Sequence, residues 1–151
     1  VKLDRIVPEG DVSRYLLQIG DILFMAKGSY NYAVCINSNL QNTVASGSFY
    51  ILRIKGNATI KPCYLAWWLN QATAQEYFRQ TQSSGATISF ISAEALRRTP
   101  VNIPSLKTQQ NIIRLNELHK AWKRKTLELS RLQTNLISIT TQKALTKKEK
   151  A

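Results

Sequence analysis

Lys27, Gly28 and Ser29 stand side by side near the start of the chain, and residues of these types bind phosphate in nucleotide-binding loops. Such loops use the spacing GxxxxGK[ST], in which the lysine follows the glycine and successive backbone N–H groups point inward. Here the lysine precedes the glycine, and Gly20 lies too far upstream to begin a loop of that kind. The three residues are therefore a turn that displays polar side chains after an apolar run at residues 22–26.

No other group of residues has a spacing that would support catalysis. His119, the single histidine, lies beside Leu118 in a helical stretch without a second residue to act with it as acid or base. The acidic residues before residue 100 are scattered, and none precedes a lysine by two positions as in a nuclease metal site. They are Asp4, Glu9, Asp11, Asp21, Glu76 and Glu94. We therefore predict that the protein is not an enzyme and holds no metal or cofactor.

Cys35 and Cys63 are too few for a zinc site, which needs about four ligands at close spacings. Two cysteines without a pattern do not indicate a disulfide scaffold either, so we expect reduced, half-buried thiols. No run approaches the ~18 apolar residues of a membrane span, and the first residues lack the apolar core of a signal peptide. These features predict a cytoplasmic protein without a membrane partner.

The charge of the chain is large and uneven. Lys and Arg number 21 against 9 Asp and Glu in 151 residues, which gives a formal net charge of +12. Residues 107–151 carry 11 basic and 3 acidic side chains, whereas residues 1–106 carry 10 and 6. A field of this sign attracts polyanions, so nucleic acid is the first partner to consider.

The first half of the chain reads mostly as sheet. Residues 22–26 form a continuous apolar run of strand length, which is typical of a strand buried on both faces. Residues 32–36 and 49–54 are two further strands, rich in aromatic and β-branched side chains.

Helical periodicity begins at Pro62 and predicts one helix to about residue 80. Its apolar face would hold Leu65, Trp68, Leu69 and Ala72. A polar loop at 82–87 and a brief strand at 88–91 follow. Ser92 then caps a short helix that ends at Arg97, and residues 101–104 are extended because they approach a proline.

From residue 108 to about residue 146 no glycine or proline interrupts a heptad pattern. Its core positions are Leu115, Leu118, Trp122, Lys125, Leu129, Leu132, Leu136, Ile139 and Lys143. A helix of ~35 residues would be roughly 50 Å long, so this apolar seam needs a partner helix. The alternative is an ordinary helix that packs flat against the sheet of its own chain. We expect the basic residues Lys120, Lys123, Arg124 and Arg131 to lie off the seam, where they face DNA phosphates or an acidic partner protein.

Together these elements predict an α+β fold: a small mixed sheet with short helices, followed by a long C-terminal coiled-coil helix. We expect a DNA-binding domain at residues 1–104, a spacer and dimerisation helix at 105–146, and a basic tail at 147–151.

The order of several short motifs resembles the target recognition domain and spacer helix of the specificity (S) subunit of type I restriction-modification systems. The motifs with the highest specificity are GDILF…KGS, which begins at Gly20, and the Pro-x-Leu-x-x-Gln sequence that starts at Pro104. Between them lie the segment at 45–53, the helix at 64–70 and Gly85, and the resemblance covers residues 16–145.

The resemblance implies a non-catalytic subunit that reads double-stranded DNA. S subunits of this family carry two recognition domains, one for each half of a split target, and two helices that pair antiparallel between them. Methyltransferase (M) subunits dock around these helices, and a separate restriction subunit cleaves DNA. This chain has one domain and one helix, so it resembles half of an S subunit, with a recognition domain that we expect to be truncated at its N-terminus. We therefore predict an antiparallel homodimer that reads two inverted half-sites.

Two groups of polar residues are the predicted DNA-binding surfaces. The first rim consists of Lys27, Ser29, Tyr30, Asn31 and Tyr32, in which the lysine neutralises a phosphate and the others contact base edges or phosphates. The second rim consists of Arg79, Gln80, Gln82, Ser83, Ser84 and Thr87, in which glutamine pairs with adenine. A plain solvated hairpin and a plain solvated loop are the alternatives.

Two other functions remain open at this point. One is a half-subunit that reads no DNA and modulates assembly by binding M or S subunits through its helix. The other is an RNA-binding module, which the lack of an aromatic-glycine RNP pattern disfavours.

Overall fold

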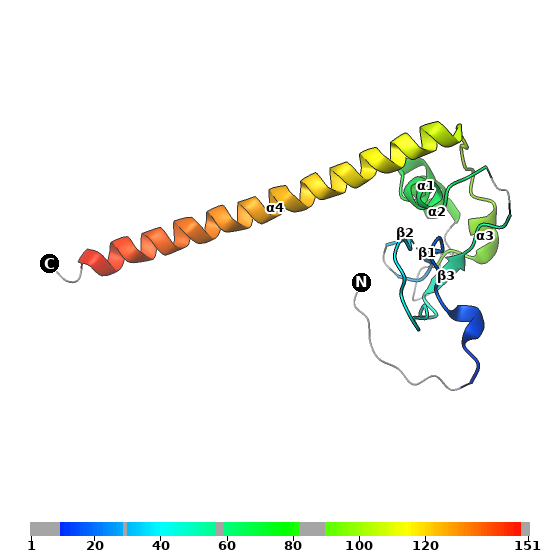
Figure 1. Cartoon of the computed structure of the whole chain (residues 1–151), viewed down its shortest axis with the longest axis horizontal. Coiled ribbons are helices and arrows are strands. Elements are labelled where there is room, and N and C mark those ends of the chain that lie inside the picture. Colours follow the sequence, from blue (N-terminus) through cyan, green and yellow to red (C-terminus); the bar gives the residue numbers. More distant parts are fainter. Residues whose placement is uncertain (1–9, 29, 57–58, 82–89, 149–151) are drawn as a thin grey trace. The chain divides into compact units, whose positions relative to one another are not determined.

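The computed structural model describes residues 10–28, 30–56, 59–81 and 90–148 of the chain. The chain divides into two compact units, residues 1–113 and residues 114–151. A short 3-10 helix at Ser13–Tyr15 precedes the named elements. These elements are β1 (Ile22–Met25), β2 (Ala33–Cys35), β3 (Phe49–Leu52), α1 (Pro62–Leu69), α2 (Ala72–Thr81), α3 (Ala93–Arg97) and α4 (Leu106–Lys148) (Figure 1).

The three strands form one sheet in the order β2-β1-β3, with β1 at its centre (Figure 1). Ile22 pairs with Cys35 of β2 and with Leu52 of β3, and both pairings are antiparallel. The α+β class predicted from the sequence is confirmed, although the described strands are antiparallel where a mixed sheet was expected. The predicted strands are also present, each one or two residues shorter than its apolar run.

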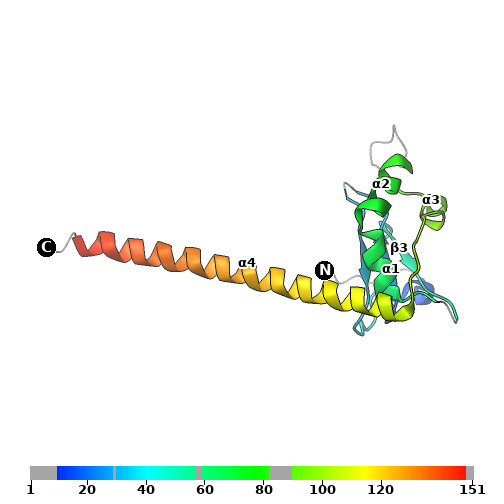
Figure 2. The same cartoon turned by 90° about the horizontal axis from the view of Figure 1, so that it is seen from above.

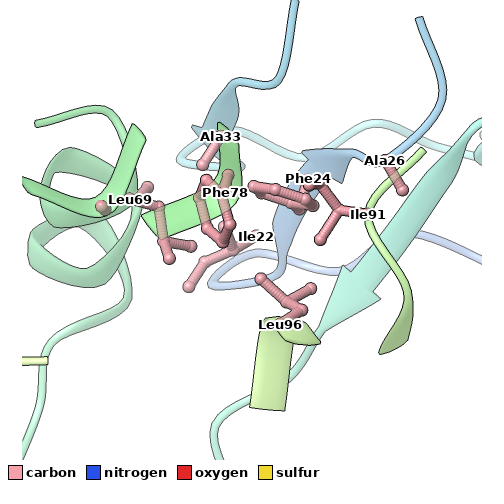
Figure 3. Close-up of a cluster of buried hydrophobic side chains, with 10 residues drawn as sticks. Ile22, Phe24, Ala26, Ala33, Leu69, Phe78, Ile91 and Leu96 are labelled. Atoms are coloured by element: carbon pink, nitrogen blue, oxygen red, sulfur yellow. The ribbon is translucent and has the colours of Figure 1, made fainter. Parts of the chain in front are cut away.

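The strand β1 is buried on both faces, as its continuous apolar sequence predicts. Ile22 and Phe24 point to one face and join a cluster with Leu69, Phe78 and other residues of the helices (Figure 3). Leu23 points to the opposite face and packs with residues 17 and 36 in a second, smaller cluster. Successive side chains of a strand alternate between faces, so only a strand covered on both sides needs an unbroken apolar run.

The helix predicted at residues 62–80 is in fact two helices, α1 and α2. They separate at Asn70, whose side chain accepts a hydrogen bond from the Ala33 N–H at 2.9 Å and donates to the Ala33 and Ala66 carbonyls at 2.8 Å. These bonds fasten the end of α1 to β2, and the chain turns there. The break also changes the buried face, since Ala72 is exposed and Ala74 is fully buried.

Cys35 and Cys63 form a disulfide in the structure, with a Cα–Cα distance of 5.0 Å, so the prediction of two reduced thiols is wrong. The bridge joins the last residue of β2 to the first turn of α1. A separation of 28 residues without a cysteine pattern gave no sign of it in the sequence. With Asn70, the disulfide attaches α1 to β2 at both ends of the helix.

The short helix α3 begins as predicted, because the Ser92 hydroxyl accepts a hydrogen bond from the Ala95 N–H at 3.1 Å. Of the strand predicted at 88–91, residues 88 and 89 lie outside the described residues. Phe90 forms an isolated antiparallel bridge with Lys27, and the Ile91 N–H donates to the Ala26 carbonyl at 2.9 Å. Residues 90 and 91 therefore run beside the end of β1.

The long helix predicted from the heptad pattern is confirmed as α4, which runs unbroken for 43 residues (Figure 2). Its first turn is capped by Ser105, whose hydroxyl accepts from the Thr108 N–H at 3.2 Å. Among the described residues, no helix combines the length and the hydropathy that crossing a membrane requires.

Candidate nucleic-acid interface

The turn that leads into β1 is held by an ion pair between the buried Asp21 and the half-exposed Arg53. Gly20 has a φ of +91°, and Asp21, which is 1% exposed, accepts hydrogen bonds from Arg53 Nε at 2.7 Å and Nη2 at 2.8 Å. The Gln18 N–H donates to the same carboxylate at 2.8 Å. The hydrogen bond from Arg53 holds the pKa of Asp21 below its usual value although burial opposes this shift. Gly20 and Asp21 of the GDILF motif thus position β1. The Asp21 carboxylate is occupied by these hydrogen bonds and is not free to act as an acid.

The first rim follows β1 as a tight hairpin. The Met25 N–H donates to the Tyr32 carbonyl at 2.8 Å, which closes the hairpin over Gly28. Gly28 has a φ of +136°, and a Cβ there would lie 3.0 Å from Met25 Cε, so the turn requires glycine. This geometry exposes Lys27 and leaves Tyr30 82% exposed.

Members of the first rim differ in how they lie. Tyr32 is 41% exposed and packs edge-on against Phe49, with ring centroids 6.3 Å apart. Asn31 is half-buried, and its amide donates to the Met25 carbonyl at 3.0 Å. The Asn31 amide, which was predicted to contact a base, therefore already donates one hydrogen bond within the hairpin. Ser29 lies outside the described residues.

The second rim begins at the last turn of α2, where Arg79 and Gln80 both bind Glu76. Arg79 forms an ion pair with this carboxylate, and Gln80 Nε2 donates to Glu76 Oε1 at 3.0 Å. All three side chains are exposed at the surface. The remaining predicted members of this rim, which are Gln82, Ser83, Ser84 and Thr87, lie outside the described residues.

The ends of the second rim are both anchored to β1 and its hairpin. At one end, Phe78 precedes Arg79 and packs against Phe24 of β1, with the two rings tilted and their centroids 5.0 Å apart. At the other end, Phe90 pairs with Lys27 of the first rim. Phe78 and Phe90, the described residues that flank the predicted second rim, therefore both contact β1 or the turn that follows it.

Gln109 is a structural residue whose role the sequence did not indicate. It is fully buried, and its Oε1 accepts from the Lys61 N–H at 2.8 Å. Its Nε2 donates to the Thr59 and Pro104 carbonyls at 2.7 and 2.8 Å. Gln109 is the glutamine of the Pro-x-Leu-x-x-Gln motif, and this motif therefore fastens the first turn of α4 to the loop before α1.

A groove of about 540 Å³ lies beside the edge strand β3. Its lining includes Tyr15, Val44, Phe49 and Ile51, and none of the predicted DNA-binding residues that the structure describes contributes to it. Among the described residues, no group of three or more His, Cys, Asp or Glu side chains is placed to hold a metal ion.

The heptad seam of α4 is exposed along its length. Its apolar members, from Leu115 to Ile139, are between 51% and 69% exposed, and Trp122 stacks on His119 with ring centroids 6.0 Å apart. Lys125, the polar member of the seam, donates to Glu128 at 3.2 Å. Leu127, Ile137 and Leu145 are also exposed although they lie off the seam. Apolar side chains of this number on an exposed helix indicate a surface that binds another protein.

Charge divides α4 into two segments of different character. Residues 107–125 contain six basic side chains and one acidic side chain, whereas residues 132–142 contain no charged residue. The second segment nevertheless holds exposed leucine and isoleucine side chains.

A comparison with protein families gave one finding. The family model for the type I restriction modification DNA specificity domain matches residues 6–118. The matched range includes both rims, both apolar clusters and the first turns of α4. A comparison with curated proteins gave no match.

Proposed function

The chain belongs to the family of type I restriction modification DNA specificity domains, and we propose that each protomer reads one half of a split DNA target. The family is one of non-catalytic subunits, so the methyl transfer and cleavage chemistry would come from partner chains. The observation that supports the proposal is the bridge between Lys27 and Phe90, because it sets a residue that follows the predicted second rim beside the first rim.

Within each half-site, we assign Lys27 to a phosphate and Tyr30 and Tyr32 to bases or phosphates near it. Ser29 and Asn31 would hydrogen-bond to base edges, as would Gln82 and the serines of the second rim. Arg79 and Gln80 would leave Glu76 to reach DNA, since an exposed ion pair costs little to break. The rims would thus combine a phosphate contact that sets position with amides and hydroxyls that distinguish bases.

The division of the chain follows from this role. We assign recognition to residues 1–104, the spacer and dimerisation helix to residues 105–146 and a basic tail to residues 147–151. The seam of α4 would pair with the same seam of a second copy, because a single copy leaves these side chains in water.

The charge pattern of α4 supports an antiparallel pair. In a parallel pair the two Lys125 side chains would meet, and both basic segments would lie side by side. In an antiparallel pair whose axis lies near residue 129, residues 116–125, which hold four of the six basic side chains, face the uncharged segment 132–142 of the twin. A two-fold pair of this kind would present its two recognition domains to inverted half-sites.

The uncharged segment also supports docking of an M subunit. Besides the seam, it carries a second uncharged stripe on the opposite side of the helix, which consists of Thr134, Ile137 and Thr141. One partner helix covers only one of these two stripes. A twin on the seam and an M subunit on the second stripe would cover both, and a restriction subunit would then join through M.

The test is selection of duplexes from a random library by the full chain, followed by titration at several salt concentrations. A reader selects a split, inverted sequence and binds it more tightly than unselected DNA by at least ~10³-fold. Equal affinity for all duplexes would contradict the proposal.

The contacts of Glu76 favour a second candidate function, because Arg79 and Gln80 are already occupied in the free chain. In this alternative the chain reads no DNA and modulates assembly by binding M or S subunits through α4. It predicts only salt-sensitive, sequence-independent association with DNA, together with tight binding to an M subunit in sedimentation.

A further inference from the structure

Among the described residues, several cations of α4 have no carboxylate partner, and four of them lie close together. In the described part of the chain, Lys120, Lys123, Arg124 and Arg131 have no acidic side chain within 4.0 Å, whereas Arg53, Arg79, Arg97, Arg98 and Lys125 each have one. Lys120 and Arg124 are also an i,i+4 pair of like charge, which destabilises a helix in isolation. The four unpaired cations therefore form a surface that an anion would stabilise.

The four cations share one side of the helix. At 100° per residue, Lys120, Lys123, Arg124 and Arg131 fall within about 100° of one another, on the side opposite Trp122 and Leu129 of the seam. From residue 120 to residue 131 this basic face is about 16 Å long. A twin helix on the seam leaves it exposed, so the face stays available in the proposed dimer.

We propose that this basic face binds phosphates of the DNA between the two half-sites, an inference that rests on the proposed pairing of two readers. About 16 Å of duplex carries roughly ten phosphate charges, enough to engage all four cations. Lysine is depleted in protein–protein interfaces, whereas phosphate binds lysine and arginine alike. DNA is therefore a better partner for this face than an acidic protein surface.

The contact adds affinity without sequence preference, because phosphates are the same at every position. The basic face would contact the phosphates between the half-sites and not those outside them. The DNA affinity of such a protein depends on the phosphate charge between the half-sites, where the protein contacts no base.

The experiment compares two full-length variants with the same loss of charge. The variant K120Q/R124Q removes two cations of the basic face, and the control R97Q/R98Q removes two exposed cations of α3 that pair with Glu94. Each is titrated with the duplex that the wild type selects and with an unselected duplex of equal length, between 50 and 200 mM salt. Circular dichroism checks that helix content is unchanged.

We expect K120Q/R124Q to reduce the magnitude of the slope of log K against log salt by about 1.8 per protomer, from ~0.9 per phosphate, and to raise Kd by at least ~10-fold. The control should change the slope by much less. Neutral methylphosphonates between the half-sites should weaken the wild type more than K120Q/R124Q, which retains two of the four cations, whereas methylphosphonates outside them should weaken both proteins equally.

Equal slopes for the two variants would overturn the proposal. Unchanged DNA affinity with lost binding to an M subunit would also overturn it, and would assign the face to a protein. Failure of the wild type to select any sequence would contradict the paired reader, but the slopes on unselected duplex would still decide whether the basic face binds phosphate.

Discussion

The unit at residues 1–113 and the unit at residues 114–151 differ in the exposure of their apolar side chains. In the first, Ile22, Phe24 and Phe78 are at most 1% exposed, and no buried side-chain nitrogen or oxygen of the described residues lacks a hydrogen bond. In the second, leucine and isoleucine side chains are more than half exposed along the whole seam. The first unit therefore satisfies its own interactions, whereas the second leaves apolar side chains exposed, and we propose that a partner covers them.

The strongest test of this comparison is to break the seam. Replacing Leu129 and Leu132 with Asp puts four buried charges into each paired seam, so we expect dimers to dissociate completely at micromolar concentration. Sedimentation velocity would report the mass of a monomer. Leu127→Asp is the matched control, since Leu127 is equally exposed but lies off the seam and should leave the dimer intact. A dimer that survives the double change would remove the coiled-coil assignment.

The next largest effect should come from the disulfide of the first unit. Replacing Cys35 and Cys63 with Ser releases a closed loop between residues separated by 28 positions, which we expect to cost roughly 3 kcal/mol of unfolding free energy. Urea unfolding followed by tryptophan fluorescence measures this loss. Reductant should lower the stability of the wild type by a similar amount and leave the double variant unchanged.

A smaller loss, about 2 kcal/mol, is expected for Asp21→Asn, because Arg53 would lose a charged partner while remaining half exposed. The same change should alter the pH dependence of stability. Since the folded pKa of Asp21 is lowered from 3.8, its contribution is present above that value and is lost as pH falls below it. Urea titrations from pH 6 to pH 2.5 should therefore show a smaller acid-induced loss in the variant. Equal losses in both proteins would mean that the ion pair contributes nothing.

The smallest effect concerns DNA. Lys27→Ala should weaken binding to every duplex by a similar factor, about three- to fivefold, because one phosphate contact is lost. Gel shifts on selected and unselected duplexes measure this factor, and Lys55→Ala serves as an exposed control outside both rims. A changed sequence preference would instead assign Lys27 to a base.

Local patterns were enough to predict the elements of both units. The apolar run of β1 predicted a strand buried on both faces, and Ser92 predicted the N-terminal cap of α3. The lack of glycine and proline predicted the long helix α4. Each of these features depends on neighbours within a few residues, so the sequence alone contains the relevant information.

Features that depend on distant partners were missed. Asn70 ends α1 because it binds Ala33, which is 37 residues away, and Gln109 reaches back about 50 residues to Thr59. The disulfide and the Asp21–Arg53 pair likewise join segments whose proximity only the folded chain creates. For the candidate site, the turn at Lys27 was predicted correctly. The ion pair of Arg79 with Glu76 and the hydrogen bond of Gln80 to Glu76 were not predicted.

The unbroken course of α4 restricts how the protein can change its length. Each residue added to a helix rotates everything beyond it by 100° and moves it by 1.5 Å. An insertion of seven residues returns the apolar stripe almost to its original side and lengthens the rod by about 10 Å, whereas an insertion of one or two turns the stripe away from its partner. Natural variants of this chain should therefore differ in α4 by insertions such as seven or eleven residues, which keep the stripe on its side, so that the protein can be lengthened only in steps.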